Sequence, residues 1–104
     1  IKEIQGDFPF EVKMFGHAGD GNLHIYTCAN EMDLVEFKKS VEQFMHLLYA
    51  KCTELGGQIS GEHGIGEKRR EFIGLTVPEE NLAWMRTIKQ ALDPNGILNP
   101  GKVF

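Results

Sequence analysis

The strongest constraint on the fold is a pair of alternating segments that flank a run of turn-forming residues. In residues 8–16, apolar side chains alternate with Glu11 and Lys13, and residues 22–28 alternate in the same way. This period of two is typical of half-buried β-strands. Residues 18–22, which read AGDGN, are of the types that form tight turns. The sequence therefore predicts a β-hairpin.

A long amphipathic helix is expected next. Its apolar residues recur at three- and four-residue steps: Leu34, Phe37, Val41, Phe44, Met45, Leu48, Cys52 and Leu55. Asn30 is a suitable N-cap residue, and the glycine pair at 56–57 should end the helix.

The second half of the chain is expected to contain shorter elements. Residues 58–60 suggest a short strand, residues 61–66 a glycine-rich loop, and residues 67–74 a short helix. The segment Thr76-Val77-Pro78-Glu79 resembles a capping box that opens a second main helix, which Asp93-Pro94-Asn95-Gly96 should end. The fold class predicted is α+β, with a small antiparallel sheet backed by two main helices.

Composition narrows the function classes. With 104 residues the chain is about one small domain, and its net charge of -4 gives no electrostatic support to nucleic-acid binding. Cys28 and Cys52 form no CxxC pair, so we interpret them as reduced thiols in a reducing compartment. The expected location is the cytoplasm, with the periphery of the inner membrane as an alternative, or the mitochondrial matrix in a eukaryote. A sheet this thin and helices with one apolar face each suggest packing against another part of the protein or self-association.

The candidate chemistry lies in the glycine-rich turns. His17 closes the first expected strand and His24 opens the second, so the hairpin turn brings them near each other, although strand parity decides whether their rings face one another. Glu62 and His63 are adjacent on the second glycine-rich loop. Two histidines and a carboxylate are a common zinc set, and they also suit iron(II) or, less naturally, manganese. The alternative is that these histidines serve only the turns that carry them.

Three segments make the chain recognisable. GHAGDGNLH at 16–24, SGEHGIG at 60–66 and DPNGILNPGK at 93–102 resemble, in order and spacing, the C-terminal domain of FAD-linked oxidases. Glycolate oxidase, D-lactate dehydrogenase and D-2-hydroxyglutarate dehydrogenase are members of this family. The resemblance spans nearly the whole chain and implies that residues 1–104 are part of such a domain, without its flavin-binding domain.

The resemblance also implies roles for individual residues. His17, His24 and Glu62 match the divalent-metal ligands of the family, and His63 matches its proposed catalytic base. Asn99 lies in the segment that runs toward the flavin in the family. The implied reaction passes the C2 hydride of a small 2-hydroxy acid to FAD, which the upstream domain mainly binds, so the chain alone is expected to be inactive.

One position departs from some members of the family. Relatives that act on a longer dicarboxylate carry an asparagine two residues after the second metal histidine, where this chain has Tyr26. This difference favours a smaller acid such as lactate or glycolate. Two other functions stay open from the residues alone: a metal-binding or dimerising module without redox activity, and a zinc hydrolase that uses His63 as base. The physiological electron acceptor is not indicated by the sequence.

Overall fold

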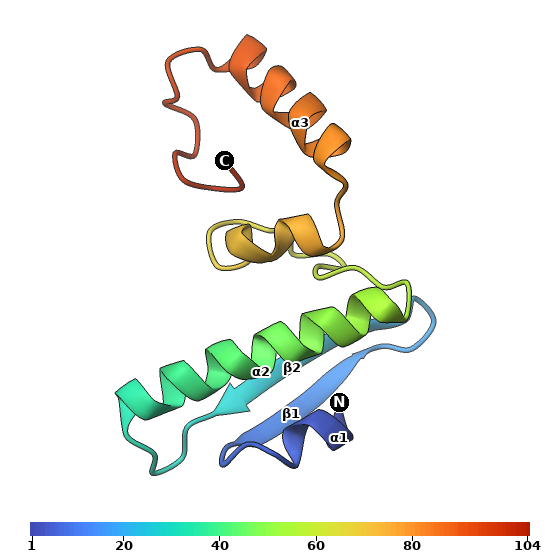
Figure 1. The fold of residues 1–104 in the computed structure, drawn as a ribbon, viewed down its shortest axis with the longest axis vertical. Helices are drawn as coiled ribbons and strands as arrows, with labels where there is room; N and C mark the ends of the chain where they lie inside the picture. Colours follow the sequence, from blue (N-terminus) through green and yellow to red (C-terminus); the bar gives the residue numbers. More distant parts are fainter. The chain divides into compact units, whose positions relative to one another are not determined.

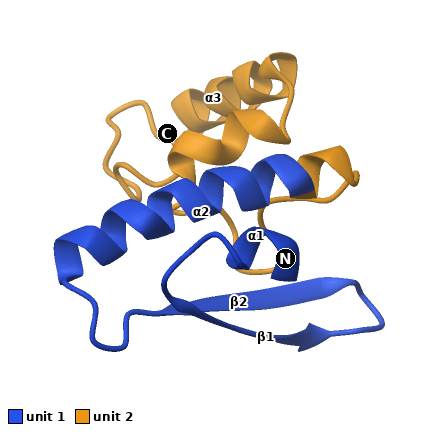
Figure 2. Ribbon diagram, turned by 60° about the horizontal axis from the view of Figure 1, so that its bottom comes forward, with its two compact units in different colours: residues 1–51 blue, residues 52–104 orange.

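The structure is a computed structural model that describes all 104 residues. Its elements are α1 (Lys2–Gln5), β1 (Glu11–His17), β2 (Asn22–Cys28), α2 (Leu34–Glu54), the 3-10 helix η1 (Arg70–Leu75) and α3 (Glu79–Leu92) (Figure 1). The chain divides into two compact units, residues 1–51 (unit 1) and residues 52–104 (unit 2), which Figure 2 shows in different colours. None of the helices combines the length and the apolar character needed to cross a membrane.

The predicted hairpin is confirmed. Strands β1 and β2 pair antiparallel in a two-stranded sheet, with a register that runs from Glu11 opposite Cys28 to His17 opposite Asn22. The turn closes with a hydrogen bond of 3.1 Å from the backbone N–H of Asp20 to the carbonyl oxygen of His17. Gly21 has a φ of 64°, a conformation that glycine adopts without a steric penalty.

The core of unit 1 lies where α2 runs along one face of the hairpin (Figure 1). Phe44 and Leu48 of α2 are buried with Val12 of β1 and with Phe10, and the rings of Phe10 and Phe44 meet edge to face at 5.4 Å. Partly buried apolar residues surround this cluster: Ile1, Ile4, Phe8, Ile25, Met32, Phe37, Val41 and Met45. The apolar stripe predicted for α2 is thus buried at its centre, whereas Leu34 and Leu55 at its two ends are exposed.

The start of α2 corrects one expectation. Asp33, and not Asn30, caps the helix: its Oδ1 accepts hydrogen bonds from the backbone N–H groups of Val35 at 2.9 Å and Glu36 at 3.2 Å. Both residue types cap helices well, but only Asp33 directly precedes the first helical residue. Asn30 instead takes a left-handed conformation with a φ of 50° in the connection from β2.

Unit 2 differs from the expectations in two places. Residues 58–60 form no strand, because the sheet consists of β1 and β2 alone and a strand needs a partner for its backbone groups. The capping box at Thr76 does not form either: Pro78 precedes α3 without a side-chain cap, and the buried Thr76 hydroxyl has no hydrogen-bond partner. The short helix expected at 67–74 is present as turns followed by η1.

Helix α3 shows an apolar stripe that unit 2 leaves uncovered. Leu82 is the buried residue of this helix, whereas Trp84, Ile88 and Leu92 are 70%, 57% and 76% exposed. Their four-residue spacing places these three side chains on one face of the helix. An apolar face of this kind is typical of a surface that another part of a protein covers.

The segment after α3 is organised by one buried carboxylate. Asp93 is 6% exposed; its Oδ1 accepts from the backbone N–H of Ile97 at 2.9 Å, and its Oδ2 accepts from that of Leu98 at 3.0 Å. Lys89 donates to the same Oδ2 at 2.5 Å and to the carbonyl oxygen of Leu98 at 2.5 Å. The hydrogen bond from Lys89, followed by those from the two backbone groups, lowers the pKa of Asp93 below its ordinary value against the opposing effect of burial.

We predict that Gly16→Ala destabilises the hairpin. A Cβ at Gly16 would overlap the carbonyl oxygen of Asn22 and crowd the Cα of Leu23 at 3.0 Å, so the strands must separate locally. We expect a loss of about 1–3 kcal/mol, measured by hydrogen exchange of the hairpin amides in the full-length protein. Gly19→Ala is the control, because a Cβ there meets nothing within 4 Å. Equal protection in both variants would contradict the close approach.

We predict that Asp93→Asn weakens unit 2 at neutral pH and removes a pH dependence. Because the folded pKa of Asp93 lies below its unfolded value, its contribution is present above the ordinary carboxyl range and disappears as the pH falls through the lowered pKa. Thermal unfolding of wild type and variant between pH 7 and pH 2.5 should differ by about 2–6 °C at pH 7 and converge in acid.

Glu67→Gln serves as the control for Asp93→Asn. A hydrogen bond from Lys102 also lowers the pKa of Glu67, but the Glu67 side chain is 73% exposed, so its ion pair should contribute little. A melting temperature that drops as far in Glu67→Gln as in Asp93→Asn would count against the buried network as the cause.

Candidate metal centre

The hairpin register places His17 and His24 on the same face of the sheet. His17 pairs with Asn22 and His24 pairs with Phe15, so the two histidines are diagonal neighbours on adjacent strands. Their rings meet edge to face, with centroids 5.4 Å apart and an interplanar angle of 83°. The ring nitrogens that approach each other are within 4.8 Å. The sequence left open whether the two side chains share a face of the sheet. In the structure they do, so both imidazoles can approach the same ligand.

Asn22 contacts the ring of His17 and was not singled out by the sequence. Its side-chain nitrogen lies 3.3 Å from His17 Nδ1. An asparagine amide presents either an N–H donor or a carbonyl acceptor to that nitrogen, and its orientation is coupled to the histidine tautomer. With the amide oxygen turned toward a protonated Nδ1, Nε2 of His17 would carry the lone pair that a metal needs. The sequence pointed to this contact indirectly, because residues 17 and 22 flank the four turn residues 18–21 and lie opposite each other once the hairpin forms.

The second glycine-rich loop holds Glu62 and His63 close together. Glu62 Oε1 lies 3.5 Å from His63 Nε2, and both side chains are largely exposed. Two hydrogen bonds within unit 2 hold the loop in shape. The Ser60 hydroxyl donates to the Gly64 carbonyl oxygen at 3.0 Å, and Arg69 donates to the same oxygen at 3.2 Å. The neighbouring carboxylate and imidazole thus point toward each other.

The tail segment is attached to this loop. The backbone N–H of Val103 donates to the carbonyl oxygen of Gly66 at 2.8 Å, and Lys102 Nζ lies 2.9 Å from Glu67 Oε2. Asn99 adopts a left-handed backbone conformation with a φ of 47° at the start of the turn that leads to Lys102. Unit 2 therefore joins the chain at the ends of two sequence motifs, the loop at 60–66 and the tail at 93–102, because each contact pairs the last residue of one motif with the residue that follows the other.

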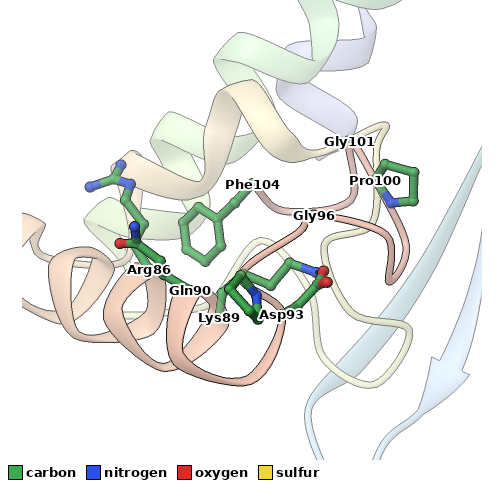
Figure 3. Close-up of a pocket in the computed structure, with 9 residues that line it drawn as sticks. Arg86, Lys89, Gln90, Asp93, Gly96, Pro100, Gly101 and Phe104 are labelled. Atoms are coloured by element: carbon green, nitrogen blue, oxygen red, sulfur yellow. Dashed lines mark hydrogen bonds and ion pairs between the residues drawn. The ribbon is translucent and has the colours of Figure 1, made fainter.

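A shallow pocket of about 320 Å³ lies beside the tail (Figure 3). Its two cationic side chains are both engaged: Arg86 pairs with Glu79 at 2.6 Å and lies 5.4 Å from the Phe104 ring centre, and Lys89 is held by Asp93. With its charges satisfied in this way, the pocket offers no unpaired cation to an acidic substrate. The histidines of the candidate site do not line it.

The residue types of the two candidate segments suit a divalent cation by their chemistry. Unit 1 supplies two imidazoles whose approaching ring nitrogens lie within 4.8 Å of each other, and imidazole nitrogen is a common zinc ligand. Unit 2 supplies Glu62 as a carboxylate and His63 as an adjacent imidazole. Nitrogen ligands together with a carboxylate are the chemistry that zinc and iron(II) accept and that manganese tolerates.

Comparison with known proteins agrees with the motifs. Residues 1–103 match the family described as FAD linked oxidases, C-terminal domain. The chain is 52% identical over 102 residues, 98% of its length, to a D-lactate dehydrogenase from Anaerostipes hadrus, and 40% identical over all 104 residues to the glycolate oxidase subunit GlcD from Bacillus subtilis. It is 36% identical over 96 residues, 91% of its length, to a D-2-hydroxyglutarate dehydrogenase from Stutzerimonas stutzeri.

The chain covers only a small part of each relative. The chain spans 22%, 22% and 21% of the length of these three proteins, so most of each relative has no counterpart in residues 1–104. The relatives are oxidoreductases, and the family name implies FAD as their cofactor. On the match of residues 1–103, this chain belongs to the FAD-linked oxidases, of which it represents C-terminal domain sequence.

Proposed function

We propose that this chain is the metal- and substrate-binding module of an FAD-dependent 2-hydroxy-acid dehydrogenase. The observation that carries the proposal is the convergence of His17 and His24 on the open face of the hairpin. Relatives that align with almost the whole chain bear the names D-lactate dehydrogenase and glycolate oxidase, which is consistent with a small 2-hydroxy acid as substrate. In this proposal residues 1–104 are one part of the C-terminal domain, and they are inactive alone.

His17, His24 and Glu62 are the residues that would hold a divalent ion. Zinc fits the two imidazoles best, and iron or manganese are the alternatives. The two histidines come from neighbouring strands of one hairpin, so their spacing is fixed by backbone hydrogen bonds rather than by loop conformation. Glu62 has two carboxylate oxygens, so Oε1 can contact His63 while Oε2 remains as a metal ligand.

His63 would act as the base that takes the substrate hydroxyl proton. Glu62 Oε1 lies beside His63 Nε2, and a carboxylate at that nitrogen favours the tautomer with the proton on Nε2. Nδ1 of His63 then carries the lone pair that accepts the proton. When bound, the metal supplies a Lewis acid for the substrate oxygens, and the flavin supplies the acceptor for the C2 hydride.

FAD would be held mainly by residues outside 1–104, in a flavin-binding domain of the same protein. Asn99 is the residue of this chain that we assign to the flavin side of the site, as the resemblance to the family implies. Its tail segment is held by Asp93 and joined to the loop that carries His63. The uncovered stripe Trp84, Ile88 and Leu92 offers an apolar surface for such a neighbouring domain or for a second copy.

The proposed substrate is a small monocarboxylic 2-hydroxy acid. Tyr26, two residues after His24, is 53% exposed on the same face of the hairpin as the histidine pair. A phenol ring at this position is bulkier and less polar than the asparagine that the family resemblance implies for members acting on a longer dicarboxylate. The position therefore favours lactate or glycolate over hydroxyglutarate.

We predict that His17→Ala and His24→Ala each weaken divalent-metal binding by at least about 10²-fold, because each removes one of three protein ligands. Metal content of the purified full-length protein, measured by mass spectrometry after dialysis, should fall from about one ion per chain to near zero. His46→Ala is the matched control, since His46 is an exposed histidine on α2. Stoichiometric metal in a His17→Ala/His24→Ala double variant would exclude this ligand set.

We predict that His63→Ala lowers turnover of a small 2-hydroxy acid by about 10²- to 10⁴-fold, the usual contribution of a general base. Metal content and flavin absorbance should stay at wild-type levels, which separates loss of the base from loss of a cofactor. His46→Ala again serves as the control for removing an imidazole from the surface. Turnover within a factor of about two of wild type would remove His63 from the reaction.

A further inference from the structure

The face of the hairpin that carries the histidine pair also carries two exposed aromatic residues. Val12 and Ile25 point toward the α2 core, so Phe15, His17, His24 and Tyr26 occupy the opposite face. Phe15 is 59% exposed and Tyr26 is 53% exposed. Large apolar side chains on the open face of a two-stranded sheet contribute little to its core, and their position beside His24 suggests another role.

The four rings form a continuous row. Tyr26 stacks on Phe15, with ring centroids 5.2 Å apart and an interplanar angle of 16°. Phe15 packs against His24 at 5.4 Å with an angle of 30°, and His24 meets His17 edge to face at 5.4 Å. The imidazole of His24 therefore lies between the ring of Phe15 and the ring of His17.

Each histidine faces a different orienting neighbour directly across the ladder. Asn22, opposite His17, contacts its Nδ1 at 3.3 Å, and Phe15, opposite His24, packs on its ring. The first contact acts through a polar atom and the second through a ring surface. Together these two contacts limit the rotation of both imidazoles. Each contact comes from the residue that the hairpin register places directly opposite the histidine.

We propose that Phe15, supported by Tyr26, is a positioning residue for His24. An imidazole that rotates freely loses side-chain entropy when a ligand fixes it. A ring already packed against Phe15 has lost part of that freedom before the ligand binds, so binding is tighter. This inference rests on the proposed metal site. It means that Phe15, an exposed residue, contributes to the metal affinity.

Tyr26 contributes through its ring rather than its hydroxyl. It stacks on Phe15, the neighbour that separates it from His24, and so limits the orientations that Phe15 can take. Tyr26→Phe should leave the metal affinity of the protein unchanged, whereas Tyr26→Ala should weaken it less than Phe15→Ala does. This graded order follows from the position of each ring in the row.

The experiment titrates zinc into the metal-free full-length protein against a chromophoric chelator. Phe15→Ala should weaken zinc binding by about 3- to 10-fold, the range expected when one side chain must be immobilised on binding. Phe15→Tyr should restore wild-type affinity, because a six-membered ring returns to the same place. The control is Leu23→Ala, an equally exposed apolar residue next to His24 on the other face, which should bind zinc like wild type.

A second readout separates positioning from general destabilisation. With cobalt(II) in place of zinc, the visible ligand-field bands should shift or broaden in Phe15→Ala and return in Phe15→Tyr, while the melting temperature of the metal-free protein stays the same. Wild-type protein that binds neither metal would overturn the metal site and the role of Phe15 with it. Wild-type protein that binds zinc, with equal affinity in Phe15→Ala, would overturn the positioning role alone.

Discussion

The antiparallel register of β1 and β2 is the constraint on which the candidate site depends. It brings residue 17 opposite residue 22 and residue 15 opposite residue 24, so both histidines, the asparagine and the phenylalanine share one face. A register shifted by one residue would send one strand's side chains to the α2 core and separate the two imidazoles. The packing of Val12 and Ile25 in and against the buried cluster opposes such a shift, because a shift would expose their apolar surface. Core packing and ligand placement are thus two consequences of one alignment.

Unit 2 holds its candidate site residues in a different way. Here the backbone is irregular, and the contacts come from side chains and from isolated backbone groups. Asp93 accepts hydrogen bonds from two backbone N–H groups and from Lys89, and the Val103 N–H donates to the carbonyl oxygen of Gly66. These contacts fix the tail that carries Asn99 and join it to the loop of Glu62 and His63. Because the network depends on an ionised carboxylate, the stability of unit 2 should fall in acid.

The proposed chemistry divides between the strand register of unit 1 and the side-chain network of unit 2. A ladder of backbone hydrogen bonds sets the spacing of the proposed nitrogen ligands, which tolerate little displacement in a metal site. The glycine-rich loop carries the proposed base, which must approach and leave a substrate and is placed on a more adaptable segment. The uncovered stripe on α3 is an apolar surface that unit 2 does not bury, and the chain spans about a fifth of the length of the relatives that it matches.

Local patterns in the sequence determined the hairpin, the span and apolar centre of α2, the end of α3 and the family, because alternation, helical spacing and glycine-rich motifs act over a few neighbouring residues. The sequence also identified His17, His24, Glu62 and His63 as candidates, and the roles assigned to them remain predictions. Only the tertiary structure decided that residues 58–60 lack a strand partner and that Asp33 rather than Asn30 caps α2. It also decided that Asn22 and Phe15 contact the histidines and that Lys102 reaches Glu67, 35 residues away. Such contacts depend on which chain segments meet in space, and no local pattern of residues encodes that.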